Sequence, residues 1–399
     1  MIKLSERVKA LKPSATLAVD AKAKALKEQG INVINLSAGE PDFDTLEHIK
    51  EACIKALKEG FTKYTPSQGI LSLRKAICEK IKEDYGIDYT PEEVIVTTGA
   101  KQAIFNLLLA LLDEGDEVII LSPYWVSYPE MVTCAGGVPK IVPSSFERHF
   151  EPDLSSFEER ITSKTVGVII NSPSNPTGLI YSREFLSGLA SIVEKHNLWV
   201  ISDDIYDKLR FDLKKPENLL SLRPELKERV FLVNGVSKTY AMTGWRIGWA
   251  LGPKEVISAC VKIQGQSTSH ATSFAQKGAE AALKTPEEEI QKMVKTFAKR
   301  AEVLSKTLRE IPEIDFIPPQ GAFYLFAKVS AYYGKKTPDG KVIQNSVDIA
   351  EYLLDKARVA VVPGVAFGED EFIRISYATS EENLLEACRR MKEALLSLD

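Results

Sequence analysis

Lys238 is the residue whose setting most clearly suggests chemistry. It lies in the stretch NGVSKTYAMTGWRIGWA, among small and apolar residues, with Arg246 further along the same stretch. A lone buried ammonium is costly, so such a lysine is either exposed or held for a reaction. A phosphate-binding P-loop requires glycines where Ser237 and Leu232 stand, which excludes that motif. The remaining interpretation is an amine that forms a Schiff base, with a pKa below its ordinary value of about 10.4.

A second group of polar residues follows two other apolar runs. Asp203 and Tyr206 lie in SDDIY, and Asn175 lies in the turn NSPSNPTG. A carboxylate at a strand end often caps a helix, and an asparagine in such a turn often binds backbone groups. Beside a Schiff-base lysine they have another use. The carboxylate keeps a pyridinium nitrogen protonated, while the phenol and the amide donate to the neighbouring ring oxygen, as pyridoxal phosphate requires.

A candidate phosphate site lies in the segment TTGAKQAIF. Gly99 interrupts an apolar run and a helical pattern begins at once, so the backbone amides of Gly99, Ala100 and Lys101 are expected at a helix N-terminus. Helix N-termini attract phosphate, although every α/β protein has such turns. With Arg246 as a neutralising cation, the segment predicts a phosphate cup.

The elements that must position these residues follow an alternating pattern. Apolar runs rich in Val and Ile are separated by segments with helical spacing, which predicts an α/β unit with a largely parallel sheet and a ligand at the carboxyl ends of its strands. The predicted strands are EVIVTT, DEVIILSP, VGVIINSP, LWVISDD and VFLVNGVS.

Beyond residue 290 the pattern changes to a long charged helix, three separated strands and a final helix from Glu381. These features indicate a smaller α+β domain, with which the N-terminal segment packs. We therefore expect a large domain over residues 48–290 and a small domain built from residues 1–47 and 291–399.

Composition restricts the class of protein. The chain has 399 residues, 44% hydrophobic and 27% charged, which is ordinary globular usage, and a net charge of −4 argues against nucleic-acid binding. The five scattered cysteines show no metal-ligand spacing and fit reduced thiols in a cytoplasmic protein. We expect no metal site, no secretory leader and no membrane span.

The motifs occur in an order that resembles a known family. SAGEPDF, KYTPSQG, NPTG, SDDIY, SKTYAMTGWRIG and FIRISYA together resemble the class I pyridoxal-phosphate aminotransferases, and more narrowly their bacterial aspartate aminotransferase subgroup, Iβ. The resemblance runs from Pro13 to the terminal helix. It implies the fold of type I pyridoxal-phosphate transferases, with a mostly parallel seven-stranded sheet and a smaller α+β domain.

The resemblance also implies roles for individual residues. Lys238 would bond the cofactor aldehyde and move the substrate proton, with Asp203 on the pyridine nitrogen and Tyr206 and Asn175 on the ring oxygen. Trp125 would stack on the ring, whereas without the resemblance an ordinary core aromatic is the favoured interpretation, and Tyr128 would support Asp203. The full set of cofactor-binding residues implied is Lys238, Asp203, Tyr206, Asn175, Arg246, Gly99, Ala100, Lys101, Trp125, Ser237 and Tyr64. Tyr64 would reach the cofactor of the neighbouring subunit, which makes a homodimer part of the prediction.

Substrate binding is expected to depend on Arg374. Within FIRIS an unpaired guanidinium would be costly, and a bidentate clamp on the substrate α-carboxylate removes that cost. Backbone near Gly39 would close over the same carboxylate. The other substrate-binding residues implied are Trp125, Asn175, Lys101 and Thr16.

The distal group of the substrate is harder to assign. Some subgroups read a distal carboxylate with a partner-chain arginine in the segment that corresponds to QGQSTSHATSFAQ, and this chain has none there. The resemblance assigns that task to Lys101. We therefore expect transfer of the amino group of aspartate to 2-oxoglutarate by a ping-pong mechanism, with prephenate or glutamate as further substrates. An aminotransferase for aromatic or neutral amino acids, a pyridoxal-phosphate lyase on the same fold, and a regulator with an added DNA-binding domain are the alternatives.

Overall fold

The computed structural model describes residues 2–12 and 15–399, and it leaves the side chains of residues 15–17 undescribed. Its largest sheet has seven strands in the order β2-β8-β7-β6-β5-β3-β4. β8 runs antiparallel to both of its neighbours, and the other paired strands are parallel. The strands are β2 (Val94–Thr97), β3 (Glu117–Leu121), β4 (Val138–Val142), β5 (Thr165–Asn171), β6 (Trp199–Asp203), β7 (Val230–Gly235) and β8 (Gly248–Leu251). The predicted mostly parallel seven-stranded sheet is confirmed.

Helices cover both faces of this sheet, which explains why its central strands are apolar throughout. Side chains alternate between faces along a strand, so Ile120 belongs to the apolar cluster that includes residues of α5, α6 and α10, whereas Ile119 and Leu121 belong to the cluster that includes residues of α4, α8 and α11. The helices concerned are α4 (Leu71–Tyr85), α5 (Ala100–Leu111), α6 (Ser127–Cys134), α8 (Arg183–Lys195), α10 (Lys254–Gly265) and α11 (Ser273–Ala282). The shorter α7 (Leu154–Glu158) and α9 (Leu219–Leu222) lie beside α8.

Two smaller sheets come mainly from the C-terminal part of the chain. A four-stranded antiparallel sheet has the order β12-β13-β10-β9, and a two-stranded parallel sheet pairs β1 with β11. Their strands are β1 (Ile34–Asn35), β9 (Asp315–Phe316), β10 (Tyr324–Lys328), β11 (Val359–Ala360), β12 (Val362–Pro363) and β13 (Phe372–Ser376). The pairing of β1 with β11 joins the N-terminal segment to the C-terminal region, as the sequence predicts.

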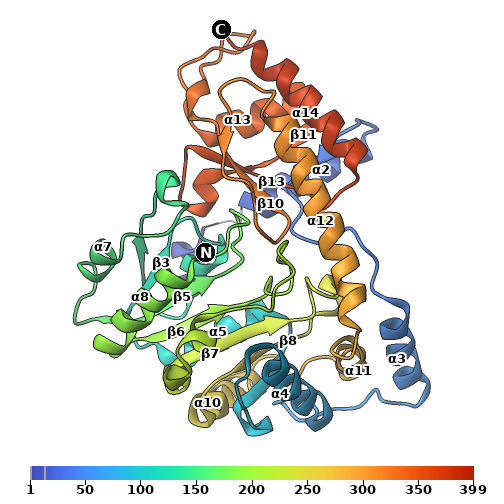
Figure 1. The fold of residues 1–399 in the computed structure, drawn as a ribbon, viewed down its shortest axis with the longest axis vertical. Coiled ribbons are helices and arrows are strands. Elements are labelled where there is room, and N and C mark those ends of the chain that lie inside the picture. Colours follow the sequence, from blue (N-terminus) through green and yellow to red (C-terminus); the bar gives the residue numbers. More distant parts are fainter. Residues whose placement is uncertain (1, 13–14) are drawn as a thin grey trace.

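The long helix α12 (Glu287–Leu308) runs between the two parts of the molecule (Figure 1). Three glutamates in its first turn favour that helix end, and Phe297 lies on its buried face. The remaining helices are α1 (Glu6–Ala10), α2 (Ala15–Glu28), α3 (Glu47–Lys58), α13 (Ser346–Tyr352) and α14 (Glu381–Leu396). The predicted domain boundaries near 48 and 290 therefore fall inside α3 and α12.

Two strands of the large sheet are absent from the five segments that the sequence singled out. β4 lies at the sheet edge and is mostly half-exposed, so its VPKIV sequence lacks a continuous apolar run. β8 has four residues and begins with Gly248, whose added Cβ would lie 2.2 Å from the Ala100 backbone nitrogen. That close approach requires glycine. Because glycine has a low strand propensity, the sequence of β8 gives little indication of a strand. Among the described residues, no helix is long and apolar enough to cross a bilayer.

Candidate active site

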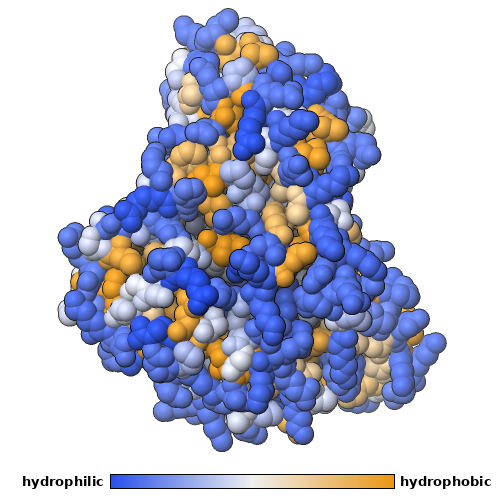
Figure 2. All heavy atoms as spheres, viewed as in Figure 1, coloured by the Kyte–Doolittle hydropathy of each residue, from blue (hydrophilic) through white to orange (hydrophobic). Residues whose placement is uncertain are grey.

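A cavity of about 260 Å³ lies where the small sheet faces the carboxyl ends of the large-sheet strands. Figure 2 shows apolar residues gathered where these two parts of the molecule meet, with hydrophilic residues over much of the surrounding face. The predicted site residues that line the cavity are Gly39, Ala100, Lys101, Trp125, Asn175, Asp203, Tyr206, Ser237, Lys238, Arg246 and Arg374. The topology thus brings together residues from distant parts of the chain.

The strand order explains how these side chains meet. Asn171 ends β5, Asp203 ends β6 and Lys238 follows the end of β7, and these three strands are parallel neighbours. Their carboxyl ends therefore lie along one edge of the sheet. Arg246 reaches the same edge because β8 runs the opposite way and begins there, with Gly248 paired to Thr97 and Gly235.

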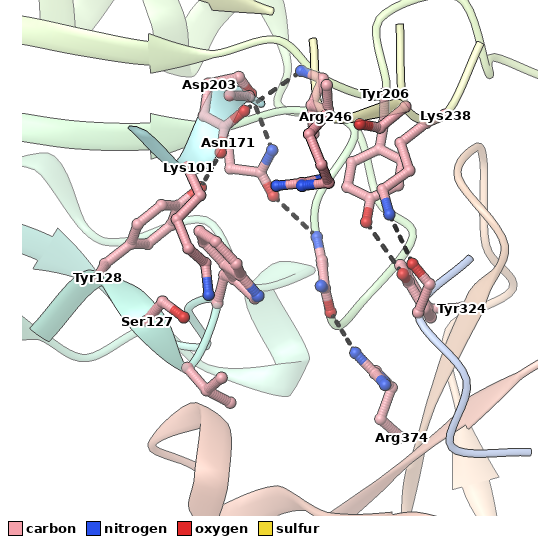
Figure 3. Close-up of a pocket in the computed structure, with 17 residues that line it drawn as sticks. Lys101, Ser127, Tyr128, Asn171, Asp203, Tyr206, Lys238, Arg246, Tyr324 and Arg374 are labelled. Atoms are coloured by element: carbon pink, nitrogen blue, oxygen red, sulfur yellow. Dashed lines mark hydrogen bonds between the residues drawn. The ribbon is translucent and has the colours of Figure 1, made fainter. Parts of the chain in front are cut away.

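Lys238 is half-buried and lines the cavity, with its amine close to the small sheet (Figure 3). Its Nζ donates to the Gly39 carbonyl at 2.5 Å. Burial lowers the pKa of Lys238 to about 8; Arg246 and Arg374 add to this, while Glu40 and Asp203 oppose it. A neutral amine is therefore accessible near neutral pH, which is what both nucleophilic attack and proton abstraction need.

Asp203 is buried at the end of β6 and lines the cavity. The Tyr128 hydroxyl donates to Asp203 Oδ2 at 2.6 Å, and the Ile205 amide donates to Oδ1 at 3.3 Å. Burial raises the pKa of Asp203 to about 6, although both hydrogen bonds oppose the rise. A buried carboxylate in this state favours a cationic ligand. The support that Tyr128 was expected to give Asp203 is present.

Arg374 lies on β13 with 1% of its surface exposed. Its Nη1 donates to Asn175 Oδ1 at 2.9 Å and its Nη2 donates to the Ser37 carbonyl at 2.7 Å. Its Nε has no hydrogen-bond partner in the described part of the chain. Burial lowers the pKa of Arg374. A guanidinium held in this way, with one donor unpaired, suits a carboxylate ligand.

The predicted phosphate cup is present only in part. Ala100, Lys101 and Arg246 line the cavity, whereas Gly99 does not, and its amide donates to the Thr97 carbonyl at 2.9 Å. Gly99 has a φ of 80°, and an added Cβ would lie 2.4 Å from Arg246 Nη2. Its contribution here is therefore to allow the close approach of Arg246. Lys101 Nζ lies 4.7 Å from the centre of the Trp125 ring, and burial lowers the pKa of Lys101.

Besides Gly99, the predicted residue Tyr64 does not line the cavity. Tyr64 is 92% exposed, and its ring makes an edge-to-face contact with His270, with centroids 5.6 Å apart. The side chain of Thr16 lies outside the described residues.

The cavity also contains residues that the sequence reasoning did not select. They are Val126, Ser127, Asn171, Ile205 and Tyr324. Asn171 ends a strand beside Asp203 and donates to its carbonyl at 2.8 Å, so its position at a strand end was an available signal. Tyr324 comes from the small sheet, and no local pattern in AFYLFAKVS distinguishes it from a core aromatic.

Comparisons with known proteins agree with this geometry. Residues 31–391 match the family model described as aminotransferase class I and II. The chain is 49% identical to the probable aspartate/prephenate aminotransferase of Rickettsia felis over 396 residues, 99% of this chain and 97% of that protein. It is 47% identical to the aspartate aminotransferase of Geobacillus stearothermophilus, covering 98% of each chain.

Solved structures show the same likeness. The aspartate aminotransferase from Rhizobium meliloti has a TM-score of 0.96 and 42% identity, with 100% of each chain covered. The Thermus thermophilus aspartate aminotransferase with maleate has a TM-score of 0.92 and 44% identity, covering 99% of this chain and 100% of that one. The resemblance drawn from the sequence motifs is confirmed, and the chain belongs to the aminotransferase class I and II family.

Proposed function

We propose that this aminotransferase uses pyridoxal 5′-phosphate to move the α-amino group of aspartate to 2-oxoglutarate. The observation that carries the proposal is the composition of one cavity, which contains the buried carboxylate of Asp203, the amine of Lys238 and the guanidinium of Arg374. The first two have pKa values shifted to about 6 and about 8 by burial. Such a combination of perturbed groups in one cavity is typical of an active site.

The residues of the cavity fit the cofactor. Asp203 would hold the ring nitrogen, Tyr206 and Asn175 the ring oxygen, and Lys238 the aldehyde carbon. Arg246 and the backbone amides of Ala100 and Lys101, which open α5, would hold the phosphate, and Trp125 would cover the ring. When bound, the protonated ring of pyridoxal phosphate withdraws electrons from the substrate carbon that loses its proton.

The protein then has two main tasks. Arg374 binds the α-carboxylate, which orients the substrate so that its α-proton faces Lys238. The neutral amine of Lys238 removes the α-proton and then, as an ammonium, returns a proton to the carbon of the cofactor that carried the aldehyde. Its lowered pKa suits both steps. The reaction occurs in two halves, one for each substrate, so the kinetics are ping-pong.

Aspartate specificity is proposed from Lys101. Its ammonium lines the cavity beside Trp125, and partial desolvation together with the positive charge of Arg246 lowers its pKa, so an anion bound there would be favoured. The similar Thermus thermophilus protein was solved with maleate, which also carries two carboxylates. Prephenate is proposed as a further acceptor, because the Rickettsia felis relative is named for both substrates.

We further propose a homodimer in which the exposed Tyr64 reaches the partner's cofactor, a cytoplasmic location, and two domains over residues 48–290 and residues 1–47 with 291–399. The ring of Tyr64, which is 92% exposed in one copy of the chain, is available to contact a second copy.

A matrix of half-reactions tests the proposal. The enzyme loaded with pyridoxal phosphate is mixed with aspartate, glutamate, phenylalanine or alanine, and the loss of the cofactor's visible absorbance is followed. The proposal expects the fastest conversion with aspartate, and recovery of the absorbance with 2-oxoglutarate. Conversion by phenylalanine alone would favour an aromatic aminotransferase. Steady release of pyruvate and ammonia would favour a lyase.

A further inference from the structure

Two phenols from different sheets meet in the cavity. Tyr206 follows β6 of the seven-stranded sheet, and Tyr324 begins β10 of the four-stranded sheet. Their Oη atoms lie 2.9 Å apart, and the side chains are 4% and 0% exposed (Figure 3). Both residues line the cavity. This contact joins the two parts of the molecule at the position proposed for the cofactor's ring oxygen.

The number of protons on the two phenols sets the direction of this hydrogen bond. Each phenol carries one O–H, and its oxygen can also accept. In the described part of the chain, the hydrogen-bond partner of Tyr324 Oη is Tyr206 Oη. When Tyr206 donates its proton to a ligand, the hydrogen bond between the phenols requires Tyr324 to be the donor. Burial raises the pKa of both phenols, which keeps both protons in place.

The ring of Tyr324 makes a second contact, with Arg374. In the antiparallel pair of β10 and β13, Tyr324 lies opposite Ser376 and Phe326 lies opposite Arg374. Tyr324 and Arg374 are thus diagonal neighbours on one face of the sheet. The guanidinium carbon lies 4.5 Å from the centre of the Tyr324 ring, within the range of a cation–π contact.

From these contacts, and resting on the function proposed above, we infer that Tyr324 is a positioning residue for both cofactor and substrate. Its hydroxyl donates to Tyr206 and so directs the Tyr206 proton to the cofactor's ring oxygen, while its ring face supports Arg374. The ionisable groups around the two phenols are Lys238, Asp203, Tyr128, Arg374 and Glu40. None of them lies between the two hydroxyls, which are in direct contact.

The test is an absorbance titration of the loaded enzyme with pH. A hydrogen bond to the ring oxygen stabilises its anionic form, so a weaker bond raises the pH at which the bound cofactor titrates. Tyr206→Phe should raise this midpoint by about 1 to 2 pH units, the size of one charge-assisted hydrogen bond. Tyr324→Phe should raise it by about 0.1 to 0.6 pH unit, because one hydrogen bond strengthens its neighbour by about 10–30%.

The double variant separates positioning from a general structural effect. If Tyr324 acts through Tyr206, then Tyr324→Phe shifts the midpoint in the wild-type background and leaves it unchanged in the Tyr206→Phe background. Tyr377→Phe is the matched control, because Tyr377 is fully buried at the end of the same sheet and donates to the Gly321 carbonyl away from the cavity. Equal shifts in both backgrounds, or no shift in either, would overturn the inference.

The contact with Arg374 has its own measurement. Tyr324→Phe keeps the ring under the guanidinium and should leave the KM for aspartate close to that of the wild type. Tyr324→Leu removes the ring face and should raise KM by about 2- to 5-fold, the size of a cation–π contact. Equal KM values for Phe and Leu would refute this half of the inference. If wild-type protein binds no pyridoxal phosphate, the proposed function fails instead, so the two failures are distinguishable.

Discussion

Replacing Asp203 by Asn should stabilise the cofactor-free enzyme at alkaline pH while abolishing its activity. Burial raises the pKa of Asp203 from an ordinary value of 3.8 to about 6. Between these values the native state binds a proton that the unfolded chain has lost, so the stability of the native state falls as pH rises from about 4 to about 6. Above about pH 6 the destabilisation caused by the buried carboxylate no longer changes with pH. A shift of this size corresponds to about 3 kcal/mol.

The substitution also has a cost, which reduces the expected gain. Tyr128 can still donate to the amide oxygen of Asn, but the Ile205 amide, now 3.3 Å from Oδ1, would face an NH₂ group. Loss of that hydrogen bond costs about 1 kcal/mol. The expected net stabilisation is therefore about 2 kcal/mol at pH 8, and it should fall to near zero at about pH 4.5, where the carboxyl is mostly protonated in the native state.

Urea unfolding of the cofactor-free proteins, followed by tryptophan fluorescence at pH 4.5 and pH 8 and at one protein concentration, measures this difference. Asp88→Asn is the control, because its side chain is 77% exposed and its replacement should change stability by less than about 0.5 kcal/mol. If the stability of Asp203→Asn relative to the wild type is the same at pH 4.5 and at pH 8, burial does not destabilise the ionised carboxylate of Asp203, and the reasoning is refuted. The activity of the loaded variant should fall by at least about 100-fold, because Asn cannot keep the ring nitrogen protonated.

Three further changes have defined outcomes. Lys101→Ala should slow the half-reaction with aspartate by about 10- to 150-fold, which corresponds to the loss of one charge-assisted hydrogen bond. The rate of the half-reaction with phenylalanine should change little. Equal decreases in both rates would show that Lys101 does not determine specificity for aspartate. Arg374→Lys should lower kcat/KM by about 100-fold or more for both amino acids, because a point charge replaces a bidentate fork, and a loss confined to aspartate would contradict an α-carboxylate clamp. Gly248→Ala should lower the melting temperature clearly, since its Cβ would lie 2.2 Å from the Ala100 nitrogen, whereas Gly244→Ala, with nothing within 4 Å, should have little effect.

The parts of the fold that sequence could predict are those with a local signature. The five apolar runs became strands because each is largely buried on both faces. Asp203 ends one of them, and Asn175 and Lys238 lie within one turn after the ends of two others. The edge strand β4 and the short β8 carry no such signature, because pairing with neighbours rather than composition creates them. Their prediction depends on tertiary contacts.

The same distinction applies to the site. Arg374 could be predicted because a charge within FIRIS requires a partner, and the structure supplies Asn175 and the Ser37 carbonyl. Tyr324 could not, because a buried tyrosine on a strand is ordinary and only the packing of the two sheets brings it to Tyr206. Gly99 was assigned as an amide donor from its position before α5, whereas its amide bonds to Thr97 within the turn.

The reversed direction of β8 has a consequence for engineering. Lys238 and Arg246 stand at the two ends of one excursion of the chain, which leaves the sheet after Gly235 and returns to it at Gly248, the residue paired with Gly235. Both ends of this excursion are anchored, so its length sets the spacing between the reactive amine and the phosphate cation. Insertions or deletions between these two residues should be tolerated far less than equal changes in the surface loops, and libraries for new substrates should vary the cavity wall around Trp125 instead.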